Sequence, residues 1–188
     1  MSPQAGGKHP RMATHNCLLR LGDRCFLEVI APDPSVPPPM WPRWFALDSL
    51  TPGAPPSLAA WVIRTSNIKK SVACASECLG RIEPMSRGAF DWSITIPADG
   101  SIPLDGALPA LIEWHTDAHP AIQLEDRGVS LAGLEIFHSD PRRISRLLQS
   151  LALDAPVSVF SVSATMKPYL VAHILTPKGL RVLSSRQL

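Results

Sequence analysis

Two apolar stretches of this chain each carry one acid that could do chemistry: "FLEVI", with Glu28, and "LIEWH", with Glu113. A carboxylate can move protons or bind a metal ion. On an apolar strand it also needs a partner, because burial of an uncompensated charge is costly. A metal ion, an arginine such as Arg64 or Arg87, or a donor group of a substrate would meet that need. We expect the two acids to converge inside one concavity of the fold.

Strand periodicity predicts which side chains accompany each acid, because side chains alternate between the two faces of a strand. Glu28 shares a face with the apolar residues two positions away on either side. Glu113 shares a face with Leu111 and His115. Imidazole and carboxylate together suit a divalent metal ion. His115 is therefore a candidate ligand beside Glu113.

The opening stretch, "GGKHPRMATHN" (residues 6–16), holds His9, His15 and Asn16. In a functional interpretation these side chains line the mouth of a binding site, where neutral imidazole can act as a base or hydrogen-bond partner near pH 7. In the alternative interpretation the stretch is a polar turn, in which paired glycines supply backbone freedom and Pro10 adds stiffness. The residues alone favour neither interpretation.

Further candidates lie in the middle of the chain. Arg87 belongs to a Ser-Arg-Gly turn in "PMSRGAFDW", where it could clamp a substrate carboxylate or phosphate; the alternative is an exposed turn arginine. Trp114, with Trp61 and Trp92, could wall an apolar ligand pocket, although tryptophans on strands commonly belong to the core.

A repeated pattern of elements must position these side chains. The segments "LAAWVIRTSNIKKSVACASECLG" and "LAGLEIFHSDPRRISRLLQSLAL" each begin with a strand-like run and continue as a helical stripe. Between the two lies a polar cap, Ser66 or Asn67 in the first segment and Asp140 in the second. Strands are then expected at Phe90–Ile96, Leu108–His115, Val157–Val162, Tyr169–Leu175 and Leu180–Ser184, and "RIEPM" (residues 81–85) is a further candidate strand after the first helix. Each segment therefore predicts a βαβββ module.

A hairpin ahead of these modules, "CLLRL" and "CFLEVI" joined at Gly22-Asp23, resembles the end of a third, truncated module. We expect one α+β domain spanning residues 1–188, with modules at about 6–31, 58–115 and 130–184 and a proline-rich connector at 31–56. The modules would form a cupped mixed β-sheet with helices on its outer face.

The composition is that of a globular domain and argues against several classes of function. Of the 188 residues, 45% are hydrophobic and 18% charged, with a net charge of +2. The chain has no basic cluster with interleaved aromatics, which argues against nucleic-acid binding. It has no apolar run long enough for a membrane span and no signal-peptide pattern at its start. Its four cysteines form no Cys-x-x-Cys pair, so we expect reduced thiols and a cytoplasmic location.

Three strings resemble the glyoxalase-like domain branch of the vicinal oxygen chelate superfamily: "GGKHPRMATHNCLLRLGDRCFLEVIAPDP", "WVIRTSNI" and "PMSRGAFDWSITIP". A GG-x-HP…GT-x-N-x-L…YLE pattern is typical of that branch; Ala13 stands here where glycine is usual, and Phe26 where tyrosine is usual. The resemblance implies the βαβββ fold and one divalent metal ion, such as Zn, Fe, Ni or Mn, in the cup. It also implies a first strand and helix ahead of the hairpin, which this sequence lacks.

In that superfamily the metal ligands resemble a set of histidine or glutamine on first strands and glutamate on last strands. Glu28 and Glu113 match the last-strand positions, whereas Ala60 stands at a first-strand position. His9, His15 or His115 would have to substitute. The resemblance thus implies Glu28, Glu113 and His115 as metal ligands, with the two acids catalytic. The implied substrate-binding residues are His9, His15, Asn16, Arg87 and Trp114.

The function implied by the resemblance is a metal-dependent lyase, isomerase or dioxygenase that acts on a small organic molecule. The alternative is a non-enzymatic, metal-free protein that binds small molecules, like the drug-sequestering members of the superfamily. The edge left by the missing first strand would favour pairing between chains, so we also expect a homodimer.

Overall fold

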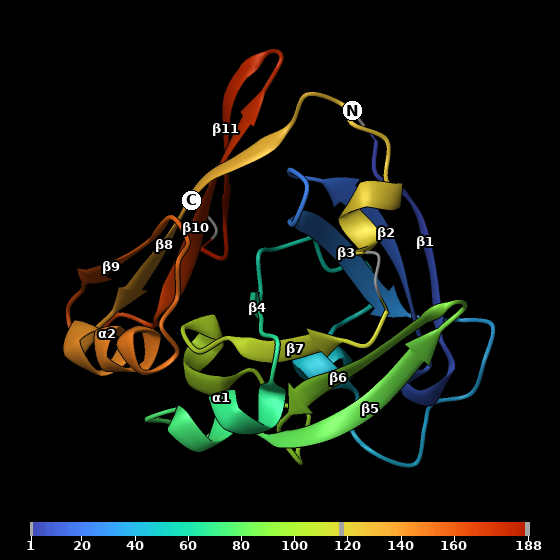
Figure 1. Ribbon diagram of the computed structural model, residues 1–188, viewed down its shortest axis with the longest axis horizontal. Coiled ribbons are helices and arrows are strands. Elements are labelled where there is room, and N and C mark those ends of the chain that lie inside the picture. Colours follow the sequence, from blue (N-terminus) through green and yellow to red (C-terminus); the bar gives the residue numbers. More distant parts are fainter. Residues whose placement is uncertain (1, 117–118, 187–188) are drawn as a thin grey trace.

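The computed structural model describes residues 2–116 and 119–186. Within these ranges it is an α+β fold with three β-sheets and two α-helices, which confirms the expected fold class (Figure 1). The N-terminal sheet lies over one side of the middle sheet, and the C-terminal sheet lies on the other side of the molecule with its last hairpin projecting outward (Figure 1).

The N-terminal sheet consists of β1 (Gln4–His9), β2 (Thr14–Arg20) and β3 (Phe26–Pro32), all antiparallel. The expected hairpin is therefore present as β2 and β3. The opening stretch is not simply a polar turn: its first half is strand β1, and a short 3-10 helix, η1 (Pro10–Met12), reverses the chain into β2. His9 ends β1 and pairs with Thr14 at the start of β2.

The middle sheet contains β4 (Val62–Arg64), β5 (Arg81–Arg87), β6 (Phe90–Ile96) and β7 (Ala110–Trp114), in the order β4-β7-β6-β5. The C-terminal sheet contains β8 (Ser130–His138), β9 (Val157–Ser161), β10 (Tyr169–Thr176) and β11 (Gly179–Ser184), in the order β11-β10-β8-β9. Both follow the chain order βαβββ, but their strand orders differ. The first strand β4 lies at an edge of the middle sheet, whereas β8 lies in the interior of its sheet. The expected duplication of modules is not confirmed.

The two α-helices begin at the predicted caps. Asn67 accepts a hydrogen bond from Lys70 N (2.9 Å) at the start of α1 (Ile68–Cys74). Asp140 accepts one from Arg143 N (3.1 Å) at the start of α2 (Pro141–Ser150), where proline occupies the first helical position. Helix α1 is shorter than its apolar stripe suggests, because the backbone becomes extended at Ala75.

The connector between the first two sheets is ordered by local contacts. It contains the 3-10 helix η2 (Trp44–Ser49). Lys8 pairs with Asp33 (2.8 Å) near its beginning, and Arg43 pairs with Asp48 (2.5 Å) farther along. Two further 3-10 helices, η3 (Pro103–Gly106) and η4 (Pro120–Gln123), flank β7.

The middle sheet separates two hydrophobic cores. Leu111 of β7 belongs to the core beneath α1 and α2, together with Ile68 and Ile144. On the other face, Trp92 packs in a core with Met12, Trp44 and Met85 between the middle and N-terminal sheets. Alternate residues of one strand therefore serve two environments: a helix-covered outer face and an inner face that looks toward the N-terminal sheet.

None of the helices in the described part of the chain combines the length and apolar character needed to cross a membrane.

Candidate functional site

Asn16 is the hub of a polar cluster between the N-terminal and middle sheets, and glycine makes room for it. Its side chain is 6% exposed and occupies the space above Gly6, where an added Cβ would overlap Asn16 Oδ1. At Gly7, which has a φ of +154°, an added Cβ would lie 2.9 Å from Arg87 Cδ. The Gly-Gly pair of the opening stretch is thus explained by two side chains that lie against it.

The amide of Asn16 links the carboxyl group of Glu28 to the guanidinium of Arg87. Its Nδ2 donates to Glu28 Oε1, and its Oδ1 accepts from Arg87 Nη1 (3.1 Å). Burial raises the pKa of the Glu28 carboxyl, an effect only partly offset by the hydrogen bond from Asn16 and the charge of Arg87. The Glu28 pKa is therefore displaced from its ordinary value, which is a common property of catalytic acids and bases but also of structural ion pairs.

His9 lies against the guanidinium of Arg87. It is 4% exposed, and its ring meets Trp44 and Trp92 edge-on, with centroid separations of 5.1 and 6.0 Å. Burial, with the charge of Arg87, lowers the His9 pKa to about 4, so the ring is neutral at pH 7. Its Nδ1 lies 3.1 Å from Thr14 Oγ1 and its Nε2 lies 3.4 Å from Arg87 Nη1. The neutral tautomer that fits both donates from Nδ1 and accepts at Nε2, which makes His9 a positioning residue for the guanidinium.

Aromatic side chains continue from Arg87 around the inner face of the middle sheet. The guanidinium lies 5.9 Å from the centroid of Phe90. Phe90 meets Trp114 at 6.1 Å, Trp114 meets His119 at 6.0 Å, and His119 meets Phe26 at 5.8 Å. Each of these rings is only partly buried.

The series of contacts begins and ends on strand β3, because Phe26 is two residues from Glu28 and so lies on the same face of that strand. We call this series the contact ring. It has a polar half and an aromatic half; its members are Glu28, Asn16, Arg87, Phe90, Trp114, His119 and Phe26. Four residues singled out in the sequence, Glu28, Asn16, Arg87 and Trp114, lie in it.

The sequence analysis did not single out His119. Its Nδ1 accepts a hydrogen bond from Ala121 N (3.2 Å), and burial, together with the charges of Arg64 and Arg24, lowers its pKa to about 4. The neutral ring therefore carries its proton on Nε2. A sequence signal did exist: His9 and His119 both precede a proline that begins a 3-10 helix, so each is fixed at a sharp change of chain direction.

Glu113 and His115 lie away from the contact ring, and the expected convergence of Glu113 with Glu28 is wrong. Glu113 accepts a hydrogen bond from Ile68 N (2.9 Å) at the start of α1, so it faces the helices together with Leu111. The ring member Trp114 is the next residue and faces the opposite side of β7. His115 is exposed and lies 2.9 Å from Ser93 Oγ through its Nε2. The predicted alternation along this segment is correct, since Glu113 shares a face with Leu111 and His115. That face is the outer one, away from the N-terminal sheet.

His15 is also outside the ring. It is exposed on β2 and alternates with the buried Asn16, so it lies on the opposite face of the N-terminal sheet.

The described residues do not supply a convincing metal-ligand set. They contain no group of three or more histidine, cysteine, aspartate or glutamate side chains that could hold an ion. The groups around Glu28 are an amide and a guanidinium, and a cationic neighbour disfavours a cation. The proposed triad of Glu28, Glu113 and His115 is not assembled, because its last two members lie on the outer face.

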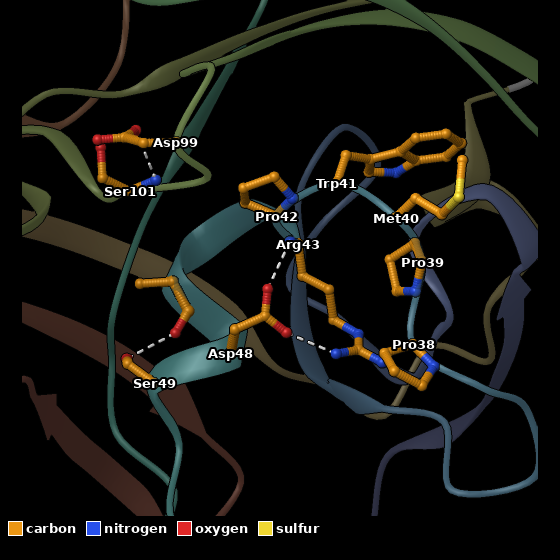
Figure 2. Close-up of a pocket in the computed structure, with 11 residues that line it drawn as sticks. Pro38, Pro39, Met40, Trp41, Pro42, Arg43, Asp48, Ser49, Asp99 and Ser101 are labelled. Atoms are coloured by element: carbon orange, nitrogen blue, oxygen red, sulfur yellow. Dashed lines mark hydrogen bonds and ion pairs between the residues drawn. The ribbon is translucent and has the colours of Figure 1, made fainter.

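A hollow lies elsewhere, along the connector. It has a volume of about 640 Å³ and lies beside Pro38–Arg43, Asp48 and Asp99 (Figure 2). Of its charged groups, Arg43 and Asp48 are paired with each other and Asp99 accepts a hydrogen bond from Ser101 N, and Met40 on its rim is 98% exposed. The contact ring is the stronger candidate, because it combines an acid of raised pKa with a guanidinium that has free N–H groups. Nε and Nη2 of Arg87 form no hydrogen bond to any described residue.

Comparison with known proteins supports the architecture. A family model described as a glyoxalase-like domain matches residues 1–152. No curated protein matches the chain. The structure is similar to the crystal structure of a hypothetical protein from Staphylococcus aureus, with a TM-score of 0.55 and 12% sequence identity over 98% of this chain and 76% of that chain. At that identity the structural likeness bears on the fold alone.

Proposed function

The chain belongs to the glyoxalase-like domain family, and from this premise we propose that it acts on a small organic molecule bound in the contact ring, with Glu28 transferring a proton. The supporting observation is the position of Glu28, whose carboxyl has a raised pKa and lies beside the Asn16–Arg87 pair. A base and an oxyanion-stabilising cation on the same side of a ligand are what enolate chemistry requires.

The reaction proposed is proton abstraction next to a carbonyl group. The Glu28 carboxylate takes a proton from the carbon, the C–H electron pair becomes a C=C bond, and the carbonyl π electrons move onto oxygen. The positive charge of Arg87 stabilises that oxyanion, as a preorganised cation does in other enolate-forming sites. Return of the proton to a different carbon or oxygen gives an isomer; loss of a leaving group from the enolate gives a lyase product.

Hydrogen–deuterium exchange tests this proposal without knowledge of the physiological product. Small 2-oxo acids and hydroxyketones are incubated with the protein in D₂O, and loss of the C–H signal adjacent to the carbonyl is followed by NMR. We expect exchange by the wild type and a loss of about 100-fold or more in Glu28→Gln, since general-base catalysis contributes factors of this order. Glu113→Gln is the matched control, because that acid caps α1 on the outer face. Equal loss in both variants, or no loss in Glu28→Gln, would refute the role of Glu28.

A second candidate function is binding without chemistry. The aromatic half of the contact ring favours it, as does Trp114 Nε1, which is buried but has no hydrogen-bond partner among the described residues and could donate to a ligand. Saturable binding of a probe by wild type and Glu28→Gln alike, with no exchange in either, would select this function.

Divalent metal binding, a homodimer and a cytoplasmic location stay predictions. Metal analysis of the purified protein with and without chelator tests the first, and light scattering tests the second.

A further inference from the structure

We propose that the ligand of the contact ring is a monocarboxylate carried on a flat aromatic body. This inference rests on the proposed function only in that it uses the same ring, and it concerns the class of molecule that the ring selects.

The carboxylate is selected by Arg87. Its Nη1 is already engaged by Asn16 Oδ1 and His9 Nε2, which fixes the orientation of the guanidinium. The edge formed by Nε and Nη2 makes no hydrogen bond to the described residues, and two parallel N–H groups of this kind match the two oxygens of a carboxylate. Partial burial strengthens the preference for an anion, since an ion pair is screened less away from water.

The charge of the ring limits the ligand to a single negative charge. Arg87 is the one cation among the ring members, because His119 is neutral at pH 7; Arg24 and Arg64, whose charges act on His119, lie near the aromatic half. Glu28 is the ring's acid, and its carboxylate lies beside the Asn16–Arg87 pair, so it repels a second negative charge on a ligand held by Arg87. A monoanion therefore pairs with Arg87, whereas a dianionic phosphate would bring a second negative charge close to Glu28.

The flat body is selected by the aromatic half. Phe90 lies at the junction, within 5.9 Å of the guanidinium and 6.1 Å of Trp114, so a carboxylate on Arg87 places its attached group against these rings. The ring planes are steeply inclined to one another, at 73° between Phe90 and Trp114 and 79° between Trp114 and His119. A planar ligand stacked on one of these rings presents its edge or face to the next, the arrangement that aromatic groups prefer.

A panel of four probes tests each element of the proposal on the unmodified protein. Benzoate, benzamide, cyclohexanecarboxylate and phenyl phosphate are titrated while amide chemical shifts are recorded, with Gly6, Gly7 and Asn16 as local reporters. We expect benzoate to bind about 10- to 100-fold more tightly than benzamide, from the charge-assisted pair. It should bind about 2- to 10-fold more tightly than cyclohexanecarboxylate, from the aromatic contacts. Phenyl phosphate should bind no more tightly than benzoate.

Two variants locate the effect. Arg87→Met should remove the preference for benzoate over benzamide, while Arg81→Met, on the exposed start of the same strand, should keep it. Circular dichroism checks that both variants fold; the wild-type panel decides the outcome if Arg87→Met does not. Benzamide or cyclohexanecarboxylate binding as well as benzoate, tighter binding of phenyl phosphate, or no binding of benzoate at 50-fold excess over the protein at millimolar concentration would overturn the proposal, as would shifts confined to the connector hollow.

The two proposals fail separately. Benzoate selectivity in the absence of any proton exchange overturns the proposed chemistry and leaves the ligand class standing. Exchange that depends on Glu28 but shows no preference for aromatic carboxylates overturns the ligand class alone.

Discussion

Replacement of Gly6 by alanine should displace Asn16, the hub of the contact ring, from a position that has no side chain of its own. The new Cβ would overlap Asn16 Oδ1 and lie 2.9 Å from Asn16 Cγ and 3.0 Å from Leu18 Cγ. Asn16 is the easier group to displace, because Leu18 is 3% exposed and packed in the sheet. A displaced amide cannot serve Glu28 and Arg87 together.

The size of the effect follows from the two hydrogen bonds at risk, both to charged partners. Each is worth about 1.5–3 kcal/mol, and some solvent will replace them, so Gly6→Ala should lower the free energy of unfolding by about 2–4 kcal/mol. Asn16→Ala should cost a similar amount by removing the same two bonds. Gly133→Ala is the control: its added Cβ would lie 3.6 Å from Pro156 O, an ordinary contact, and should change stability by less than about 1 kcal/mol.

A double-mutant cycle decides whether the amide is the cause. In the Asn16→Ala background the obstruction above Gly6 is gone, so Gly6→Ala should add about 1 kcal/mol or less, from the contact with Leu18. Urea denaturation followed by tryptophan fluorescence gives all four stabilities. If the losses of stability in the two single variants add up to the loss in the double variant within about 0.5 kcal/mol, Gly6→Ala does not act through Asn16. That result would refute the reasoning about the hub.

Three further outcomes are expected, each measured by urea denaturation. Burial raises the pKa of Glu28 above its ordinary 4.5, so the folded state holds the proton more tightly and stability falls as the pH rises through the folded pKa; Glu28→Gln should be the more stable protein at pH 8 and should lose that advantage near pH 4. The His9 pKa is lowered from 6.5 to about 4 by burial and by Arg87, so about 3 kcal/mol of stability present above pH 6.5 should be lost as the pH falls to 4, and His9→Gln should remove that part of the dependence. Glu77→Gln should cost less than about 1 kcal/mol and less still in 0.5 M salt, because its bidentate partner Arg143 is 39% exposed; a loss above 2 kcal/mol would contradict this.

Local signals predicted the elements well. Asn67 and Asp140 begin helices because their side chains accept from backbone N–H groups that no helical carbonyl can reach, and this depends on nearby sequence alone. Strand β6 lies where alternation placed it, Phe90–Ile96. Strand β1 was missed, since two glycines and a His-Pro dipeptide are poor strand formers; their presence reflects the side chains of Asn16 and Arg87 that lie above them.

Long-range arrangement was harder to predict. The alternation around Glu113 predicted which residues share its face of the strand, but not what that face packs against. The packing depends on whether helices or another sheet cover each side of the middle sheet. Equally, a βαβββ order does not determine strand pairing, as the edge position of β4 and the interior position of β8 show. Asn16 and Glu28 belong to the first of the three strings that resemble the family and Arg87 to the third, and hydrogen bonds through Asn16 join them in the structure. His119 lies outside these strings and is joined to the other three residues only by the folded chain.

The contact ring joins the N-terminal and middle sheets directly between Asn16 and Arg87, and a second time through His119, at the start of η4, between Phe26 and Trp114. The separation of its members therefore depends on the spacing of the two sheets, between which Met12 and Trp44 pack. Substitutions that thicken or thin this layer would move Glu28 and Asn16 relative to Arg87. Under the proposed function, they would change ligand selectivity through residues that never contact the ligand.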